Sequence, residues 1–369
     1  MEPTNPGASP GEKPLEDAKD EFLAEKDGNY ATNLEYVLEK FLEWCDRRDV
    51  HTLEDVRPLT MRHYASYLKR RSKADEGISA SSARTYYNYV SALLSWGVEV
   101  GILAENPAEK REAKKPLPKN VSSTSADQQF WSPEQRQTIV EYVDEQARTA
   151  IDTDGTDPFE PIRNRALVTV LAYTGVRASE ILADYRDDRR NGLRWGDVDL
   201  EGNVINVLGK GSQGIEEVGL TGQTIGPLRR LESVLNEPDD SWPVFPSRHP
   251  PSLYGRIEAA GYDRPDSDPW GFVLENGVEP PSMSVSGART LLKRLSKVAD
   301  VPGLDLENGE YLTLHGARRG VGEALFREHG AQRAQRTLRH SDPKTTSEMY
   351  SHIEASELGE DNTEVFDQE

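Results

Sequence analysis

The stretch Leu312–Ile353 constrains the fold of this chain more than any other, because it concentrates chemically versatile side chains in one run. The run reads LTLHGARRGVGEALFREHGAQRAQRTLRHSDPKTTSEMYSHI. His315 and Arg318 stand three residues apart, so they share one face of a helix. A phosphate-binding site here needs a second contributor, and the distant segment YTGVRASEIL supplies one in Arg177. We therefore expect a fold that brings these two segments together.

Composition narrows the class of protein. The chain has 369 residues, enough for two domains with separate cores. Its single cysteine, Cys45, excludes an intramolecular disulfide. Its seven histidines are scattered and lack paired cysteines, so we expect no finger-type zinc site, no other metal and no cofactor. No apolar run approaches the length of a membrane span, and the N-terminus is polar and acidic, which predicts a cytoplasmic protein without a membrane partner.

The net charge of -20 argues at first against a nucleic-acid partner, since Lys and Arg drive phosphate binding. The distribution of charge changes that conclusion. Residues 57–119 carry a net +6 and residues 311–352 a net +3, whereas the remaining segments are all acidic. This pattern is typical of a protein in which only chosen faces meet double-stranded DNA.

The ratio of arginine to lysine, together with the acidic composition, bears on the salt concentration at which the protein works. Arginine outnumbers lysine by 30 to 14 in this acidic chain. At high salt, screening shortens the reach of repulsion between like charges, so an acidic surface is tolerated there. We therefore predict a halophilic source, most simply a halophilic archaeon.

The N-terminal part is predicted to form an arm and a helical domain. Residues 1–30 have almost no apolar periodicity and are expected to be a flexible acidic arm. Apolar residues then recur at steps of three and four from Asn33, which predicts a helix. A second helix is expected at Pro58 with Thr60 as N-cap, and a third from Ser81 or Ser82 that buries Tyr86 and stops at Gly97. With a short helix over 98–106, these form a helical domain over 31–110.

The remainder is predicted to contain a linker, a larger domain and a tail. Residues 111–129 are basic, contain proline and lack periodicity, so they are expected to be a linker. A domain over 130–353 follows, opened by a helix with Ser132 as cap. Three short strands are expected at 193–195, 204–207 and 218–220, with the turn Gly209–Ser212 between the last two, and residues 354–369 form an acidic tail. The predicted fold class is mainly α with a small antiparallel β-sheet.

Arg177 and Arg318 are the candidate phosphate ligands. Their planar guanidinium groups can each donate two parallel, charge-assisted hydrogen bonds to phosphate oxygens. Arg177 follows Gly175, where a helix restarts, and Glu180 can brace it from three residues on. The alternatives are a structural salt bridge for Arg177 and Glu180, and a helix-terminal His315 beside a solvated Arg318.

His340, Tyr350 and Lys210 complete the candidate set. His340 can bind the same phosphate or assist proton transfer. Tyr350 is the candidate nucleophile, although its free pKa near 10 means that attack needs a base and positive surroundings. Lys210, in the hairpin turn, can donate a proton to a leaving oxygen. The alternatives are a core tyrosine and an ordinary surface lysine.

Taken in order, Arg, Lys, His-x-x-Arg, His and Tyr form a far more specific pattern than any one of them. Residues 130–353 resemble the catalytic domain of tyrosine site-specific recombinases, the phage integrase family. The matching segments are YTGVRASEIL, GKGSQ, LTLHGARRG, LRHSD and TTSEMYSHI. The helical segment 31–110 resembles the family's core-binding, SAM-like DNA-binding domain.

The resemblance implies a chemistry and a set of roles. Arg177 and Arg318 would bind the scissile phosphate, Lys210 would protonate the 5′ hydroxyl, and His315 would transfer a proton. His340 would support the phosphate, and Tyr350 would attack it to form a 3′-phosphotyrosyl link, with no metal and no ATP. The family also implies a homotetramer on paired DNA sites, which integrates or excises a mobile element or resolves DNA dimers.

Three features depart from the family pattern. Arg319 stands where a histidine often follows the second arginine, and Arg339 precedes His340 where glycine is typical. Residues 184–192 look like an insertion between the helix of Arg177 and the first strand. None of these departures removes a predicted catalytic side chain.

DNA contacts are expected from the basic part of the N-terminal half. The candidate residues are Lys69, Arg70, Arg71, Lys73, Arg84, Lys114 and Lys115. Two rival functions remain. The same side chains could serve a type IB topoisomerase that relaxes DNA, or the chain could be an integrase-derived repressor that binds DNA without cutting it.

Overall fold

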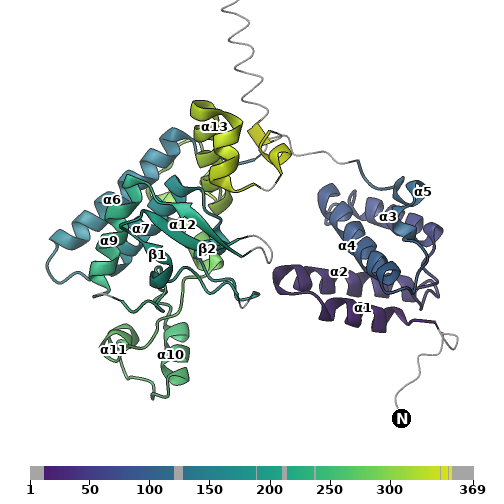
Figure 1. Cartoon of the computed structure of the whole chain (residues 1–369), viewed down its shortest axis with the longest axis horizontal. Helices are drawn as coiled ribbons and strands as arrows, with labels where there is room; N and C mark the ends of the chain where they lie inside the picture. Colours follow the sequence, from purple (N-terminus) through teal and green to yellow (C-terminus); the bar gives the residue numbers. More distant parts are fainter. Residues whose placement is uncertain are drawn as a thin grey trace, which may run out of the picture. The chain divides into compact units, whose positions relative to one another are not determined.

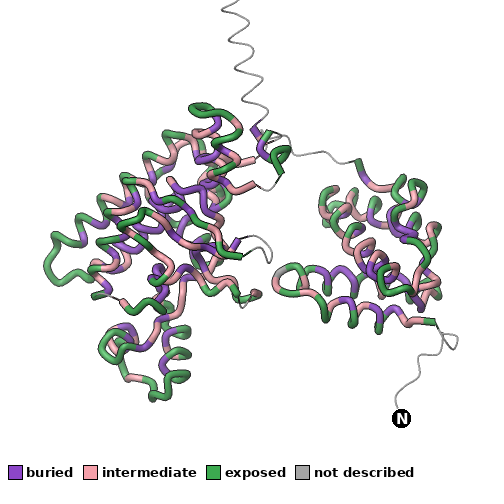
Figure 2. The backbone as a smooth tube through the Cα atoms, viewed as in Figure 1, coloured by how far each residue is buried: buried purple, intermediate pink, exposed green. Residues whose placement is uncertain are grey.

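Two units, each built mainly of helices, make up the chain (Figure 1). They comprise residues 1–122 and 123–369. The computed structural model describes residues 12–119, 128–187, 189–209, 214–236, 238–340, 342–347 and 349–350, with the side chain of Asn29 left aside. The predicted fold class, mainly α with one small antiparallel sheet, is confirmed. Buried residues gather inside each unit and exposed residues outside (Figure 2).

The N-terminal unit is a small helical bundle. Its helices are α1 (Leu15–Ala24), α2 (Gly28–Asp46), α3 (Pro58–Arg71), α4 (Ala80–Glu99), the 3-10 helix η1 (Pro107–Glu109) and α5 (Arg111–Lys114). The apolar faces of α1 to α4 meet in one core, with Phe41 stacked near Trp44 and Tyr64 edge-on to both rings. This apolar burial stabilises the unit.

The prediction of a flexible arm over residues 1–30 is wrong for residues 12–30, and residues 1–11 lie outside the described part. Leu15, Ala18 and Phe22 are buried on one face of α1. The Phe22 ring lies 6.1 Å from that of Trp96, whose Nε1 donates to Glu25 at 2.9 Å. Three apolar positions are enough for a short helix with tertiary partners, although its acidic composition hides the pattern.

Other helix boundaries also differ from the prediction. Arg57 is the N-cap of α3, and the Thr60 hydroxyl accepts a hydrogen bond from the Arg57 N–H at 3.2 Å. In α4, Tyr87 is buried instead of Tyr86, and its hydroxyl donates to the Ala108 carbonyl. The predicted stop at Gly97 is wrong because α4 runs to Glu99, and no helix occupies 101–106.

The predicted linker over 111–129 is too long at both ends. Residues Arg111–Lys114 form α5, which packs against α3 and buries Ala113. On the far side, Gln129 belongs to the second unit, since its amide nitrogen donates to the Tyr311 carbonyl at 2.7 Å and its amide oxygen accepts from the Thr313 N–H at 2.6 Å. Residues 120–127 lie outside the described part of the chain. Local composition did not reveal these partners because each is distant in sequence.

The second unit is organised around helix α7 (Phe159–Thr174), which is buried along most of its length. Its helices are α6 (Pro133–Asp152), α7 (Phe159–Thr174), α8 (Ala178–Ile181), η3 (Trp195–Asp197), α9 (Gly222–Val234), α10 (Pro250–Ala259), α11 (Pro269–Glu275), α12 (Val285–Val298) and α13 (Leu314–Leu338). Helices α6, α9 and α13 pack against α7 (Figure 1). Ser132 caps α6, as predicted, and the structure adds a reciprocal hydrogen-bonded pair between Ser132 and Gln135.

A three-stranded antiparallel sheet lies beside these helices. It consists of β1 (Val198–Asp199), β2 (Val204–Leu208) and β3 (Ile215–Gly219), in the order β1-β2-β3. Val204 pairs with Gly219 and Leu208 with Ile215. The strand predicted at 193–195 is not part of this sheet, because its backbone pairs with residues 242–244 instead.

Helix α13 carries much of the candidate site. The helix is interrupted at Gly330, which has a φ of 76° inside α13. Residues 343–347 and 349–350 are also helical, and Pro343 stands at the first of these positions. Among the described residues, no helix is both long and apolar enough to span a membrane.

Candidate active site

Arg177 lies in the tight connection between α7 and α8. Gly175 ends α7 in the left-handed conformation, with a φ of 70°. A Cβ at this position would also come 3.0 Å from a methyl group of Leu338, so both backbone and packing favour glycine. Two residues later, Arg177 is the N-cap of α8. The sharp turn therefore places the Arg177 side chain next to the end of α13.

Arg318 is almost completely buried on α13, with 3% of its surface exposed. Its Nη1 donates to the Gly175 carbonyl at 2.5 Å, and its Nη2 donates to the Leu338 carbonyl. Burial and the charge of Arg177 lower the pKa of Arg318 to about 9, which still leaves the guanidinium charged at neutral pH. Arg318 is therefore a buried cation stabilised by two backbone carbonyls.

The turn after α13 lies against both arginines. The Leu338 carbonyl accepts from Arg318, and the Arg339 carbonyl accepts from Arg177 Nη2 at 3.4 Å. The His340 carbonyl accepts from Gln335 at 3.2 Å. Three successive carbonyls thus connect the turn to the two predicted phosphate ligands and to α13 itself.

Glu180 braces Arg177, as the sequence predicts. Its carboxylate accepts from the Arg177 backbone N–H and from Arg177 Nη1, each at 2.7 Å, and from Arg339 Nη2 at 2.5 Å. Burial alone would raise the pKa of Glu180, but Arg339 and the bonds from Arg177 lower it below its usual value. The carboxylate remains charged and offsets part of the positive charge in the site.

The two candidate histidines lie within the field of these arginines. Burial, followed by the charges of Arg319, Arg318 and Arg177, lowers the pKa of His315 to about 4. Burial and the charges of Arg318 and Arg177 have the same effect on His340, whose pKa is also about 4. His340 Nδ1 lies 2.8 Å from the Thr346 hydroxyl. Both imidazoles are therefore neutral at pH 7 and can accept a proton.

Tyr350 is buried away from solvent in this structure. Its ring packs 5.3 Å from that of Phe326 and 6.1 Å from that of Phe130, and its hydroxyl donates to the Arg319 carbonyl at 3.3 Å. Burial raises the pKa of Tyr350, although the charges of Arg318 and Arg319 oppose that effect. The candidate nucleophile is thus near the site but protonated and enclosed.

Lys210 lies outside the described residues, as do residues 211–213. The strands on either side are described, and Gly209 N–H donates to the Gly214 carbonyl at 3.0 Å across the hairpin. The structure therefore describes the two ends of the turn in which the sequence has Lys210. The role predicted for this lysine stays a prediction.

The candidate DNA contacts occupy the surface of the N-terminal unit. Lys69, Arg70 and Arg71 form the last turn of α3, and Lys73 follows. None of these, nor Arg84, Lys114 or Lys115, forms an ion pair with an acidic side chain in the described part of the chain. By contrast, Lys13, Lys40 and Lys110 are each paired with glutamate.

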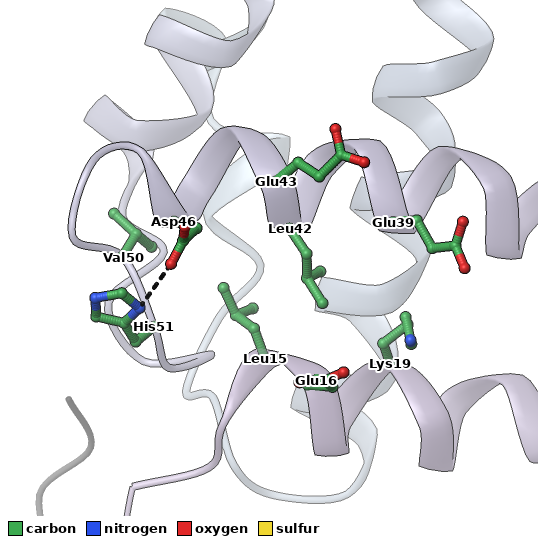
Figure 3. Close-up of a pocket in the computed structure, with 9 residues that line it drawn as sticks. All are labelled: Leu15, Glu16, Lys19, Glu39, Leu42, Glu43, Asp46, Val50 and His51. Carbon is green, nitrogen blue, oxygen red and sulfur yellow. Dashed lines mark ion pairs between the residues drawn. The ribbon is translucent and has the colours of Figure 1, made fainter. Parts of the chain in front are cut away.

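A pocket of about 470 Å³ on the same unit has the opposite character (Figure 3). It is lined by Leu15, Glu16, Lys19, Glu39, Leu42, Glu43, Asp46, Val50 and His51. Four of these are acids, and His51 lies 3.9 Å from the carboxylate of Asp46. An acidic lining repels phosphate, so this pocket is not a DNA site.

Sequence reasoning missed partners that act through distant contacts. Arg190 donates to backbone carbonyls beside the hairpin, and Arg339 pairs with Glu180 and Glu216. Both residues lie in segments that depart from the family pattern, and this departure was the sequence signal that could have identified them. Thr346, buried beside His340, had no such signal, because its partner is set by the turn between them.

Comparison with known proteins identifies the family. The profile described as the Phage integrase family matches residues 143–357, which is more than half of the chain. That described as the Phage integrase SAM-like domain matches residues 15–115. The chain belongs to the phage integrase family. The second match begins with α1, in agreement with the helix found there.

Relatives within this family are tyrosine recombinases. Tyrosine recombinase XerC of Xylella fastidiosa (strain 9a5c) is 26% identical over 280 residues, which cover 75% of this chain and 72% of the relative. Among solved structures, the Tn1549 transposon integrase in complex with circular intermediate DNA has a TM-score of 0.55 at 14% identity, covering 92% and 95% of the two chains. XerH bound to its difH substrate has a TM-score of 0.53 at 15% identity, with 89% and 78% covered. The structures share the fold, and by family the chain is a tyrosine recombinase enzyme.

The lowered pKa values of the two histidines lead to a titration experiment. We expect the imidazoles of His315 and His340 to titrate near pH 4 in the DNA-free protein, measured by nuclear magnetic resonance of their Cε1 protons. In urea both should titrate near about 6.5. Between these two values the unfolded chain binds more protons, so both histidines lower folding stability as the pH falls from about 6.5 to about 4. Folded-state midpoints of about 6.5 would contradict the burial of these imidazoles beside the arginine charges.

The enclosure of Tyr350 depends on a glycine. A methyl group at Gly322 would overlap the Tyr350 hydroxyl and come 2.5 Å from Leu338. We expect Gly322→Ala to displace the Tyr350 ring at a cost of about 1–3 kcal/mol, and nitration by tetranitromethane to increase at Tyr350. Gly226→Ala is the control, since a Cβ there meets nothing within 4 Å. Equal protection of Tyr350 in both variants would show that the ring does not need this space.

Proposed function

We propose that this recombinase cuts and rejoins double-stranded DNA through a 3′-phosphotyrosyl intermediate. The observation that carries the proposal is the pair Arg177 and Arg318, whose guanidinium groups meet at the turn after α13. Two neutral histidines lie in the field of the same arginines. Convergent cations of this kind suit a phosphodiester, because the transition state carries more negative charge than the ground state.

The proposed reaction is a transesterification at phosphorus. The Tyr350 oxygen bonds to the scissile phosphorus, and the bond from phosphorus to the 5′ oxygen breaks. The tyrosine proton leaves to a base, and the 5′ oxygen receives a proton from Lys210. Arg177 and Arg318 bind the non-bridging oxygens throughout. Attack by a 5′ hydroxyl of a partner strand reverses these steps and releases the tyrosine.

His315 is the proposed base. Its lowered pKa leaves the imidazole neutral at pH 7, so it can accept the proton of Tyr350. His340, equally neutral, can donate or accept a hydrogen bond at the phosphate. Burial and the charges of Arg177 and Arg318 lower the pKa of both histidines, and the same two arginines are the proposed phosphate ligands.

The reaction requires Tyr350 to leave its enclosed position. In the described conformation the hydroxyl faces the Arg319 carbonyl and no solvent reaches the ring. We propose that DNA binding triggers this movement of Tyr350. A DNA phosphate beside Arg318 would change the charge around the turn that precedes Pro343. Burial of the nucleophile in the free protein limits reaction away from DNA.

The partners follow from the fold and the unpaired basic side chains. The proposed DNA surface of the N-terminal unit comprises Lys69, Arg70, Arg71, Lys73, Arg84, Lys114 and Lys115. The solved structures with this fold include DNA complexes of the Tn1549 transposon integrase and of XerH. By analogy we propose a homotetramer on paired sites in the cytoplasm, acting in integration or excision of a mobile element or in resolution of DNA dimers.

A covalent trapping experiment tests the chemistry. Full-length protein is incubated with DNA fragments flanking its own gene, and protein–DNA adducts are separated on a denaturing gel. We expect an adduct on one fragment with the wild type and none with Tyr350→Phe, because phenylalanine lacks the attacking oxygen. Tyr142→Phe, a partly buried tyrosine outside the site, is the matched control and should retain the adduct.

Each other outcome points to a different function. Adducts on every fragment, with relaxation of plasmid DNA, would favour a topoisomerase. Equal binding by wild type and Tyr350→Phe on the host's own site, without any adduct, would favour a repressor. An adduct that persists in Tyr350→Phe would move the nucleophile to another residue.

The acidic composition supports a halophilic source as part of the proposal. With a net charge of -20, repulsion between acidic side chains lowers stability at low salt. We expect Tm to rise between about 0.1 M and about 2 M KCl, because the Debye length falls from about 10 Å to less than about 3 Å. Circular dichroism at a helix band gives the measurement. A constant or falling Tm would argue for a source at ordinary salt.

A further inference from the structure

Two of the departures from the family pattern lie at one place in the structure. Arg339 occupies the position where the family typically has glycine, and Arg190 belongs to the inserted segment 184–192. The function proposed above assigns a role to neither residue. Both side chains reach the β2–β3 hairpin, and both also reach the short helix α8 that follows Arg177.

Arg339 connects to the second strand of the hairpin. Its Nε donates to Glu216 of β3 at 2.7 Å, while its Nη2 donates to Glu180 of α8 at 2.5 Å. Only 12% of the Arg339 side chain is exposed. The Glu216 carboxylate in turn lies against Gly209, where a Cβ would come 2.8 Å from its oxygen. This path runs from the active-site turn to the residue just before Lys210.

Arg190 forms hydrogen bonds with the end of β2, the first strand of the hairpin. Its Nη2 donates to the Gly209 carbonyl at 2.9 Å, and its Nη1 donates to the carbonyls of Leu208 at 3.3 Å and Ser179 at 3.0 Å. Asp187 lies 3.5 Å from Arg190 Nε and orients the guanidinium. The end of β2 is therefore bonded to α8 as well.

The backbone at Arg339 strengthens the argument for its side chain. Arg339 has a φ of 52°, in the left-handed region that glycine occupies at little cost. A non-glycine residue there costs on the order of 1 kcal/mol. Two charge-assisted pairs with Glu180 and Glu216 offset this cost. The position therefore carries an arginine for contacts that glycine cannot make.

We propose that Arg190 and Arg339 are positioning residues for the general acid of strand cleavage. Each bonds one strand of the hairpin to α8, so both ends of the turn that contains Lys210 are held relative to Arg177. This inference rests on the proposed function, in which Lys210 protonates the leaving 5′ oxygen. Proton transfer needs close geometry, and a displacement of about 1 Å can cost about a hundredfold in rate.

A leaving-group substitution tests the proposal. The substrate is a duplex from the fragment on which the wild type forms its adduct, made with either the normal 5′ oxygen or a 5′-bridging sulfur. A thiolate leaves without protonation, so sulfur bypasses the general acid. We expect Arg190→Gln and Arg339→Gln to form the adduct about 10- to 100-fold more slowly on the oxygen substrate, and near the wild-type rate on the sulfur substrate.

Three controls separate this proposal from the function on which it rests. Lys210→Ala should be restored by sulfur, whereas Arg318→Gln, which loses a phosphate ligand, should not. Arg229→Gln removes an exposed ion pair with Glu201 and should match the wild type on both substrates. Equal losses for Arg190→Gln and Arg339→Gln on both substrates would overturn the positioning role. A wild type without an adduct, or no rescue of Lys210→Ala, would overturn the proposed function instead.

Hydrogen exchange of the full chain without DNA tests the tether itself. In Arg190→Gln and Arg339→Gln, amides of β2 and β3 should exchange faster, while those of the buried helix α7 should be unchanged. Faster exchange confined to the hairpin supports the tether even if cleavage fails. Unchanged exchange in the hairpin, or faster exchange throughout the unit, would overturn it.

Discussion

The candidate active site depends on the burial of one positive charge, that of Arg318. A guanidinium removed from water is costly unless hydrogen bonds replace its hydration. Arg318 has two such bonds, to the carbonyls of Gly175 and Leu338, which lie at the C-terminal ends of α7 and α13. Helix ends carry partial negative charge, which suits a cation. Arg177 lies two residues after Gly175, and His340 lies two residues after Leu338. The hydrogen bonds that stabilise Arg318 therefore also bring Arg177 and His340 to the same place.

The same charges set the protonation of their neighbours. Burial lowers the pKa of His315 and of His340, and the charges of Arg318 and Arg177 lower it further, so both imidazoles are neutral. Tyr350 lies where burial outweighs the arginines, so its hydroxyl stays protonated against the Arg319 carbonyl. The free protein thus has the arginines and the neutral histidines assembled while Tyr350, the proposed nucleophile, is enclosed. This arrangement is consistent with an enzyme in which the proposed nucleophile becomes exposed only when DNA is bound.

The departures from the family pattern make sense as additions to this arrangement. Arg339 adds a positive charge next to Arg177 and His340, and the buried carboxylate of Glu180 offsets it at a distance of 2.5 Å. The insertion over 184–192 contributes Arg190, whose contacts are with backbone carbonyls and so depend on the path of the chain more than on nearby side chains. Arg339 and Arg190 both connect the sheet to α8, a helix of only four residues.

The sequence by itself determined the features that arise locally. Helical periodicity, the Ser132 cap, the interruption at Gly175 and the spacing of His315 and Arg318 were all readable, since each involves residues within a few positions. The tertiary structure decided the rest. Helix α1 is stable because Phe22 meets Trp96, Tyr87 is buried because its hydroxyl meets Ala108, and Arg318 is satisfied by carbonyls of two distant turns. Such partners are far apart in sequence, and no local pattern specifies which carbonyl a buried arginine will meet.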